Sequence, residues 1–193
     1  ITTRFSTGIN GFHAVINSPD YMVYIDPYTA QDHDHYIVYY TTNHEDTSLR
    51  NRVLCGTQNT HDDQDKKPKW GTRKFLEGKM EFRKYRLALA CTGEWGAVRG
   101  TKEKALSDMV TFVERANILF EAELAIRVVL VANNDVLINL DGTADLYSEP
   151  EKGLSILGQN TAIISSRIGF GNYDIGHVFS ICYDVGGVAG GNI

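Results

Sequence analysis

The sequence predicts an α/β fold that starts with a strand–helix–strand unit and is preceded by a small antiparallel β segment. Two observations lead to this prediction. Short runs rich in Val, Ile, Tyr and Phe fill residues 11–42, and an amphipathic helical pattern lies between two apolar runs over residues 83–134. The residues between these regions are polar and charged, so we expect two folded units joined by a linker.

The first unit, residues 1–43, contains three runs with the composition of β-strands. These are GFHAVI, YMVYID and HYIVYY, and the turn residues NSPD separate the first two. Phe12, Ala14 and Ile16 alternate along the first run, as expected for a strand with one apolar face. The pattern predicts a hairpin that extends into an antiparallel meander.

Residues 44–80 have the composition of a linker, because they include few apolar side chains and no sustained hydrophobic period. One part of this segment is basic and extended, which suits cleavage by a processing protease. A merely solvated linker explains the same composition equally well. The basic run comprises Lys66, Lys67, Lys69, Arg73 and Lys74.

The second unit, residues 81–193, opens with a predicted strand in RKYRLALACT. A glycine-bearing loop, Gly93 to Gly100, is expected to follow, and Thr101 is a suitable N-cap for the helix predicted after it. Apolar side chains recur at helical spacing in TKEKALSDMVTFVERANILF, namely Leu106, Met109, Val110, Val113 and Phe120.

The run LAIRVVLVANN, residues 124–134, is almost continuously apolar, which is typical of a strand buried on both faces. Together with the strand and helix before it, this run predicts a βαβ unit. A short second helix is expected near Thr161 to Arg167. The closing stretch predicts another strand, with Ile175, His177 and Phe179 on one face and Gly176 and Val178 on the other.

Composition and charge exclude several classes of function. The chain has 19 Lys and Arg against 24 Asp and Glu, a net charge of −5, and no basic stripe with which to bind nucleic acid. Its longest apolar stretch is too short to cross a bilayer, so no membrane partner is expected. The loop GEWGAVRGTK does not have the residue order of a phosphate-binding loop.

Two parts of the chain contain side chains of metal-binding types, and each also has an ordinary structural interpretation. His33 and His35 lie beside Asp32 and Asp34, but no third ligand follows at a recognisable spacing, and a solvated turn is favoured. Cys55 lies in RVLCGTQ, a small apolar island of the linker. Either its thiolate caps a metal in a partner domain, or it is an ordinary thiol packed under a loop.

Four segments, taken together and in order, resemble a known family. YRLALACTGEW, LAIRVVLVANND, ILGQN and GNYDIGHVFS, the last followed by GGVAG, are similar to the front half of a reprolysin-like (adamalysin-type) zinc metallopeptidase. This family belongs to the metzincin clan, and the likeness is to its bacterial secreted branch. It covers roughly residues 83–193, while the upstream strands resemble the end of the family's propeptide.

The resemblance implies how the chain is organised. Residues 1–43 would be a propeptide-like antiparallel β segment and residues 44–80 a charged linker. Residues 81–193 would form the N-terminal part of a catalytic domain, a metzincin-like upper subdomain with a mixed twisted sheet and helices. It also implies a protein that is secreted or located at a bacterial cell surface.

The resemblance also implies where the chemistry lies. The family's zinc motif, H-E-x-x-H-x-x-G-x-x-H, does not occur in the 193 residues and is expected downstream of Ile193. No catalytic residue and no metal ligand is therefore expected in this chain, and zinc is expected as a cofactor of the full-length protein only. The expected partners are a peptide or protein substrate and the downstream half of the same catalytic domain.

One strand of this chain receives a role by resemblance. It is the edge strand along which substrate pairs in extended form, and it comprises Asp174, Ile175, Gly176, His177, Val178 and Phe179. Gly176 fits this role because a missing side chain allows close backbone approach. By the same resemblance Cys55 is a candidate latency thiol.

Two alternatives to a protease precursor remain open at this point. The chain could be a metzincin-derived domain without catalysis that binds or supports another protein. A further alternative is that residues 1–79 act in trans as the inhibitor of a partner protease.

Overall fold

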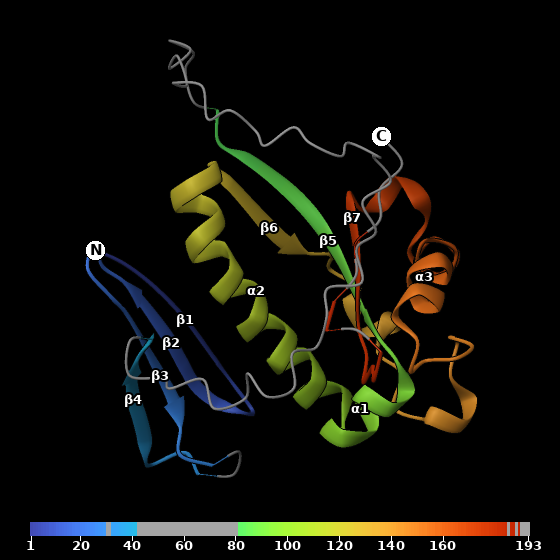
Figure 1. The fold of residues 1–193 in the computed structure, drawn as a ribbon, viewed down its shortest axis with the longest axis horizontal. Helices are drawn as coiled ribbons and strands as arrows, with labels where there is room; N and C mark the ends of the chain where they lie inside the picture. Colours follow the sequence, from blue (N-terminus) through green and yellow to red (C-terminus); the bar gives the residue numbers. More distant parts are fainter. Residues whose placement is uncertain (30–31, 42–80, 185, 188, 190–193) are drawn as a thin grey trace, which may run out of the picture.

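The computed structural model spans the chain, and the structure describes residues 1–29, 32–41, 81–184, 186–187 and 189. Within these residues there are two β-sheets, and the long helix α2, Lys102–Leu124, lies between them (Figure 1). Cys55 and the basic run of the linker lie outside the described residues. None of the described helices has both the length and the apolar character needed to span a membrane.

The N-terminal sheet is an antiparallel meander of four strands in sequence order. The three predicted strands are present, and an additional strand, β1, precedes them. The sequence does not indicate β1, because its residues TTRFSTG are mostly polar and give no clear alternation of apolar side chains. The strands are β1 Thr2–Gly8, β2 Gly11–Asn17, β3 Met22–Pro27 and β4 Tyr36–Tyr40.

The second sheet is parallel and has three strands in the order β6-β5-β7. Helix α2 connects β5 to β6, and α3 precedes β7 in sequence. The strands are β5 Arg83–Cys91, β6 Ile126–Leu130 and β7 Ile175–Phe179. Helix α3, Gly153–Ile168, includes the predicted second helix and begins earlier. The short 3-10 helices are η3 Asn134–Leu137, η4 Gly142–Ala144 and η5 Phe170–Asn172.

Each face of the parallel sheet packs against its own hydrophobic core. Alternate residues of β5 point to opposite faces. Leu87 and Leu89 join Met109 of α2 in one core, whereas Ala88 joins Ile164 of α3 in the other. The centre of β5 is consequently buried on both sides, with Leu89 fully inaccessible to solvent.

Strand β6 differs from the prediction that it would be buried on both faces. It lies at one edge of the sheet, and of its residues only Val128 is buried, while Val129 is 44% exposed. A continuous apolar run indicates a strand, but the sequence does not show whether a further strand will cover its second edge. The amide of buried Asn117 bonds to both the N–H and the C=O of Val128 and holds β6 against α2.

The segment Gly93–Arg99, predicted as a loop, forms a short helix, α1. Its glycines reflect close packing, because a Cβ built at Gly93 or Gly96 would overlap the backbone of residues 139–142. In the sequence alone, glycines at these positions indicate a loop. The following helix α2 begins as predicted at Thr101, whose hydroxyl accepts a hydrogen bond from the Lys104 N–H at 3.2 Å.

Candidate functional site

A groove of about 760 Å³ runs along β7. One wall comes from Phe112 of α2, and the other comes from Ile156, Leu157 and Asn160 of α3. The residues that follow β7, including Ile181 and Cys182, also line it. None of the lining residues is Asp, Glu, Lys or Arg, so the groove is an apolar channel with a few polar groups.

The free edge of β7 faces this groove. Among the described strands, β7 pairs only with β5, in a register from Leu87↔Ile175 to Cys91↔Phe179. The C=O of Phe179 accepts from the N–H of Thr92 at 2.9 Å. Alternate residues of a strand bond to the same neighbour, so the N–H and C=O of Gly176 and Val178 point toward the other edge.

Aromatic rings cover the α2 face of β7. His177 stacks on Phe112 with ring centroids 6.2 Å apart and planes 7° apart, and Phe179 meets Phe112 edge to face at 4.9 Å. Burial by these rings lowers the pKa of His177, although part of the side chain stays exposed. The imidazole is therefore neutral at neutral pH and acts as an aromatic wall.

On its α3 face, β7 packs closely at Gly176. A Cβ built there would lie 3.1 Å from Ile164 Cδ1 and 3.6 Å from Asn160 Nδ2. The missing side chain thus lets the strand approach α3 closely. Asn160 is 5% exposed, and its Oδ1 accepts a hydrogen bond from the Tyr147 hydroxyl at 2.8 Å.

Asp174 fixes the start of β7. Its Oδ1 lies 2.8 Å from Arg86 Nη2, and its Oδ2 accepts from the backbone N–H of Arg86 at 2.7 Å. The side-chain hydrogen bond from Arg86 is the main reason that the pKa of Asp174 falls to about 2. Both oxygens of this carboxylate bond to Arg86 of β5. Asp174 therefore affects the groove by holding β7 in place.

The predicted site residues are therefore close together in β7, but their side chains face different parts of the structure. Ile175 and His177 form part of the α2 wall, Gly176 and Val178 face α3, and Phe179 packs into the core beside Trp95. The structure adds Asn160 and Cys182 as groove residues that the sequence pattern did not indicate. One signal in the sequence could have indicated Asn160. Ile156, Asn160 and Ile164 recur at helical spacing, so the Asn160 amide lies on the buried face of a helix.

The described residues offer no place for a zinc ion. No group of three or more His, Cys, Asp or Glu side chains among them lies close enough together to hold a metal. His35 bonds to Asp32, with Nδ1 and Oδ2 3.0 Å apart, and this pair has no third partner of that kind. Buried Cys91 has a pKa raised to about 11, mainly by burial, so it is a thiol and not a metal-binding thiolate.

The arrangement defines a class of protein, namely an α/β domain with an exposed parallel strand beside an uncharged groove. Comparison with protein families gives a match to part of the chain. The family model described as metallo-peptidase family M12B, reprolysin-like, matches residues 106–192. The matched residues include most of α2 and all of α3 and β7, and over this part the chain is similar to that family. Neither a curated protein nor a solved structure matches the chain.

Proposed function

We propose that the chain is the N-terminal portion of the precursor of a secreted zinc-dependent endopeptidase. The family match over residues 106–192 supports this proposal, since M12B enzymes are zinc-dependent peptidases. The zinc motif is expected downstream of Ile193. Hydrolysis of the peptide bond is accordingly assigned to residues outside this chain, and the chain itself contributes the groove.

The single observation that carries the proposed role of the groove is the edge of β7 beside it, which pairs with no other strand among the described residues. An extended peptide can add to such an edge through main-chain hydrogen bonds, and its alternate side chains then meet the two walls. The N–H and C=O of Gly176 and Val178 are the groups that bond to the peptide. Ile175 and His177 contact side chains on the α2 side, while Asp174 and Phe179 hold the ends of the strand.

The N-terminal unit has a role of its own in this proposal. Residues 1–43 are a propeptide-like sheet, and residues 44–80 join it to the catalytic part and contain the processing site. Polar contacts between the sheet and α2 support a unit that separates after cleavage. Ser6 Oγ lies 2.8 Å from Thr111 Oγ1, and Asn10 Nδ2 donates to Asp108 Oδ1 at 2.6 Å. The proposed location is the bacterial cell surface or the medium.

A second candidate is a metzincin-derived domain that binds peptides without cutting them. The groove favours this candidate as much as the first, because strand addition along β7 requires no metal. Reading the gene downstream of the codon for Ile193 separates the two. The first requires H-E-x-x-H-x-x-G-x-x-H within the same open reading frame, and a stop codon before it would leave only the second.

The direct test is hydrolysis of a quenched fluorescent peptide by the full-length protein. We expect activity that a chelator abolishes, while the 193-residue chain alone is inactive. Val178→Pro removes one N–H from the free edge of β7, so it should raise KM about fivefold without changing zinc content. Chelator-sensitive hydrolysis by the 193-residue chain would contradict the assignment of catalysis to downstream residues.

A further inference from the structure

The N-terminal sheet has one face that no described helix covers. Its other face lies against α2, where Ser6 bonds to Thr111 and Asp26 bonds to Arg115 (Figure 1). Because successive side chains of a strand point to opposite sides, the neighbours of these sheet residues face away from the helix. Phe5 is one of them, and it is 62% exposed. We call this second surface the outer face of the sheet.

The outer face is apolar at its centre and has hydroxyl groups at its corners. The strand register arranges it as three rows of four side chains, one from each strand. Thr3 and Thr7 of β1 and Tyr36 and Tyr40 of β4 stand at the corners. The remaining positions are Phe5, Phe12, Ala14, Ile16, Val23, Ile25, Pro27 and Val38. None of the twelve residues is Asp, Glu, Lys or Arg.

Aromatic rings lie close together along this face. The ring centroid of Phe12 is 5.9 Å from that of Phe5 and 6.2 Å from that of Tyr36. Val38, at the opposite edge of the sheet from Phe5, is 61% exposed. Apolar surface of this kind is unfavourable in water, and a contiguous exposed patch marks an interaction site.

The chemistry of the outer face restricts what can cover it. A charged partner would find no opposite charge and would lose its hydration without compensation. A pleated, uncharged surface fits, because two sheets pack face to face about 10 Å apart with their side chains interdigitated. The same face of a second copy is such a surface. Since it has no charged side chain, no like charges meet when a two-fold axis relates the two copies.

The size of the outer face indicates how strongly two copies associate. Four strands about 4.8 Å apart and five residues long measure about 19 Å by 17 Å, or about 300 Å² in projection. Stable interfaces of standard size bury about 800 Å² of accessible surface on each partner. The association is therefore expected to be reversible, with monomer and dimer in exchange.

We propose that the outer face is a self-association surface, on which the N-terminal sheets of two copies of this chain pack face to face as a β-sandwich. The apolar centres of the two faces cover each other, and the Thr and Tyr hydroxyls lie at the rim, as is usual for an interface. The groove along β7 takes no part. The inference is consequently independent of zinc and of peptide binding, and it can fail without affecting the proposed function.

Sedimentation velocity of the 193-residue chain tests the proposal. Between about 1 and 500 µM protein we expect a shift from monomer to dimer, with a Kd between about 1 and 100 µM. A chain that stays monomeric over this range would overturn the proposal. The outer face would then be covered in another way, for example by a segment of this chain outside the described residues.

Two substitutions at opposite edges of the sheet identify the surface. Val38→Lys on β4 and Phe5→Lys on β1 each place a charge from both copies in the apolar interface, and each should raise Kd about 30-fold or more. Both side chains are mostly exposed in a single copy, so the fold should tolerate the change. Val98→Lys is the matched control, because it makes the same substitution at an exposed position of α1 and should leave Kd unchanged. Far-ultraviolet circular dichroism checks that all three variants fold.

The same variants separate face packing from pairing along the edge of β4. Edge pairing would join the β4 strands of two copies, and β1 lies about 14 Å from that edge. A dimer that Phe5→Lys leaves intact would therefore contradict the proposal. Equal effects of Val38→Lys and Val98→Lys would place the contact on another surface and contradict it as well. Salt does not screen apolar contacts, so the dimer should persist at about 1 M salt, and its dissociation there would be a third contradiction.

Discussion

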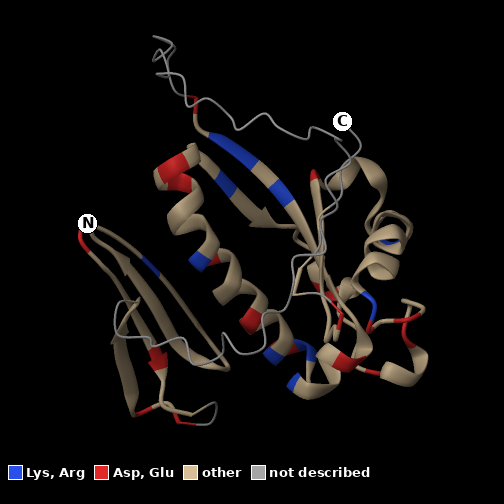
Figure 2. Ribbon diagram, viewed as in Figure 1, with Lys and Arg blue, Asp and Glu red and all other residues tan. Residues whose placement is uncertain are grey.

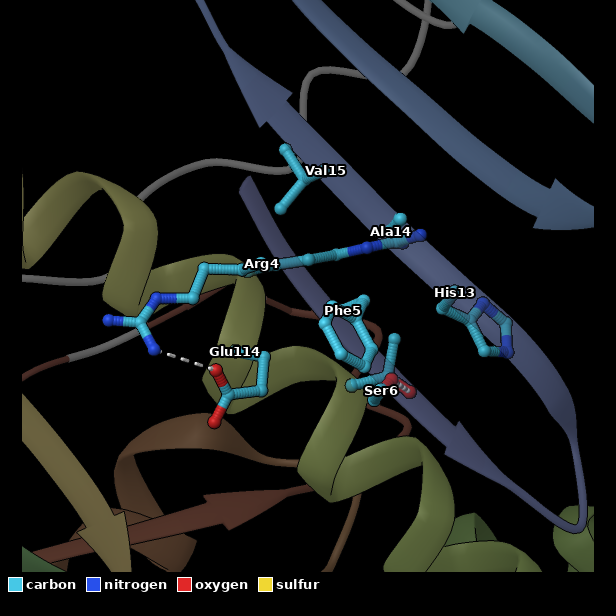
Figure 3. A pocket seen from close by; sticks show the side chains of 9 residues that line it. Arg4, Phe5, Ser6, His13, Ala14, Val15 and Glu114 are labelled. Carbon is cyan, nitrogen blue, oxygen red and sulfur yellow. Dashed lines mark hydrogen bonds and ion pairs between the residues drawn. The ribbon is translucent and has the colours of Figure 1, made fainter. Parts of the chain in front are cut away.

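Helix α2 contacts the parallel sheet through apolar side chains and the N-terminal sheet through polar and charged ones. On the first side, Met109 and Val113 are buried against Leu87 and Leu89. On the second side, Arg4 forms an ion pair with Glu114 (Figure 3). Arg4 also forms an ion pair with Glu121. Charged residues of both signs recur along the helix (Figure 2). One helix thus belongs to two interfaces that differ in their physical basis.

The polar interface centres on Asp26. Its carboxylate bonds to Arg115 of α2, to His13 Nδ1 at 2.6 Å and to the Tyr39 hydroxyl at 2.7 Å. Burial alone would raise the pKa of Asp26, but the hydrogen bonds from His13 and Tyr39 and the charge of Arg115 outweigh it and lower the pKa. Burial and the neighbouring carboxylate raise the pKa of Tyr39 to about 12.

This polar interface also contains buried polar atoms that lack hydrogen-bond partners. His13 Nε2 and Arg115 Nε are buried without a hydrogen-bond partner in the part of the chain that the structure describes. The desolvation of such groups reduces the net gain from the ion pairs. We infer that the N-terminal sheet opens before the parallel sheet does, and the following substitutions test this difference.

The largest effect is expected in the apolar core. Leu89→Ala removes a fully buried side chain at the centre of β5 and leaves a cavity, so it should lower the free energy of unfolding by about 3 kcal/mol. Urea denaturation measures the change. Val98→Ala, at a position 70% exposed, is the control and should change it by less than about 0.5 kcal/mol.

A smaller loss is expected at the buried amide of α2. Asn117→Ala leaves the N–H and C=O of Val128 without their partners and should cost about 2 kcal/mol in the same urea experiment. Amide hydrogen exchange should then increase in β6. A loss as small as that of Val98→Ala would mean that water replaces the Asn117 side chain.

Loss of the central carboxylate should affect the polar interface selectively. Asp26→Asn leaves Arg115 without its ion partner and should weaken docking of the N-terminal sheet by about 1.5 kcal/mol. Hydrogen exchange should rise in β1–β4 and stay unchanged in β5. Equal increases in both sheets would show that the two interfaces open together and would contradict the comparison.

Acid should act on the same carboxylate. The pKa of Asp26 is lowered from its ordinary value of 3.8, so its contribution is fully present above that value and is lost as the pH falls through the lower, folded pKa. Protection of β1–β4 should therefore be constant above about pH 5 and decline below about pH 4. In the Asp26→Asn variant this decline should be much smaller.

The smallest effect is expected at the end of the interface. Arg4→Gln removes the ion pairs with Glu114 and Glu121 and should weaken docking by about 0.5 kcal/mol, because partly exposed pairs contribute little. Added salt should reduce the difference between the variant and the unaltered protein. A difference that persists at about 1 M salt would show that the aliphatic part of Arg4, and not its charge, matters.

Much of the fold could be predicted from the sequence because the relevant signals are local. Runs rich in Val, Ile, Tyr and Phe predicted β2 to β4, and the helical period with Thr101 as N-cap predicted α2. Helix α1 could not be predicted in this way, since its glycines are explained only by the backbone of residues 139–142, more than 40 residues away. Strand β1 packs on a polar surface of α2, so its sequence lacks the alternating apolar side chains that would have indicated a strand.

The candidate site also has features that the sequence predicts and features that only the tertiary structure shows. The sequence by itself determined the strand that ends in His177 and Phe179, and its likeness to reprolysin-like peptidases is confirmed over residues 106–192. Only the tertiary structure decided that Asn160 lies beside Gly176, because that pairing depends on how α3 packs on β7. It also decided which face of the N-terminal sheet meets α2. Alternation identifies two faces, but the docked face is the charged one, and Phe5 and Val38 remain more than half exposed.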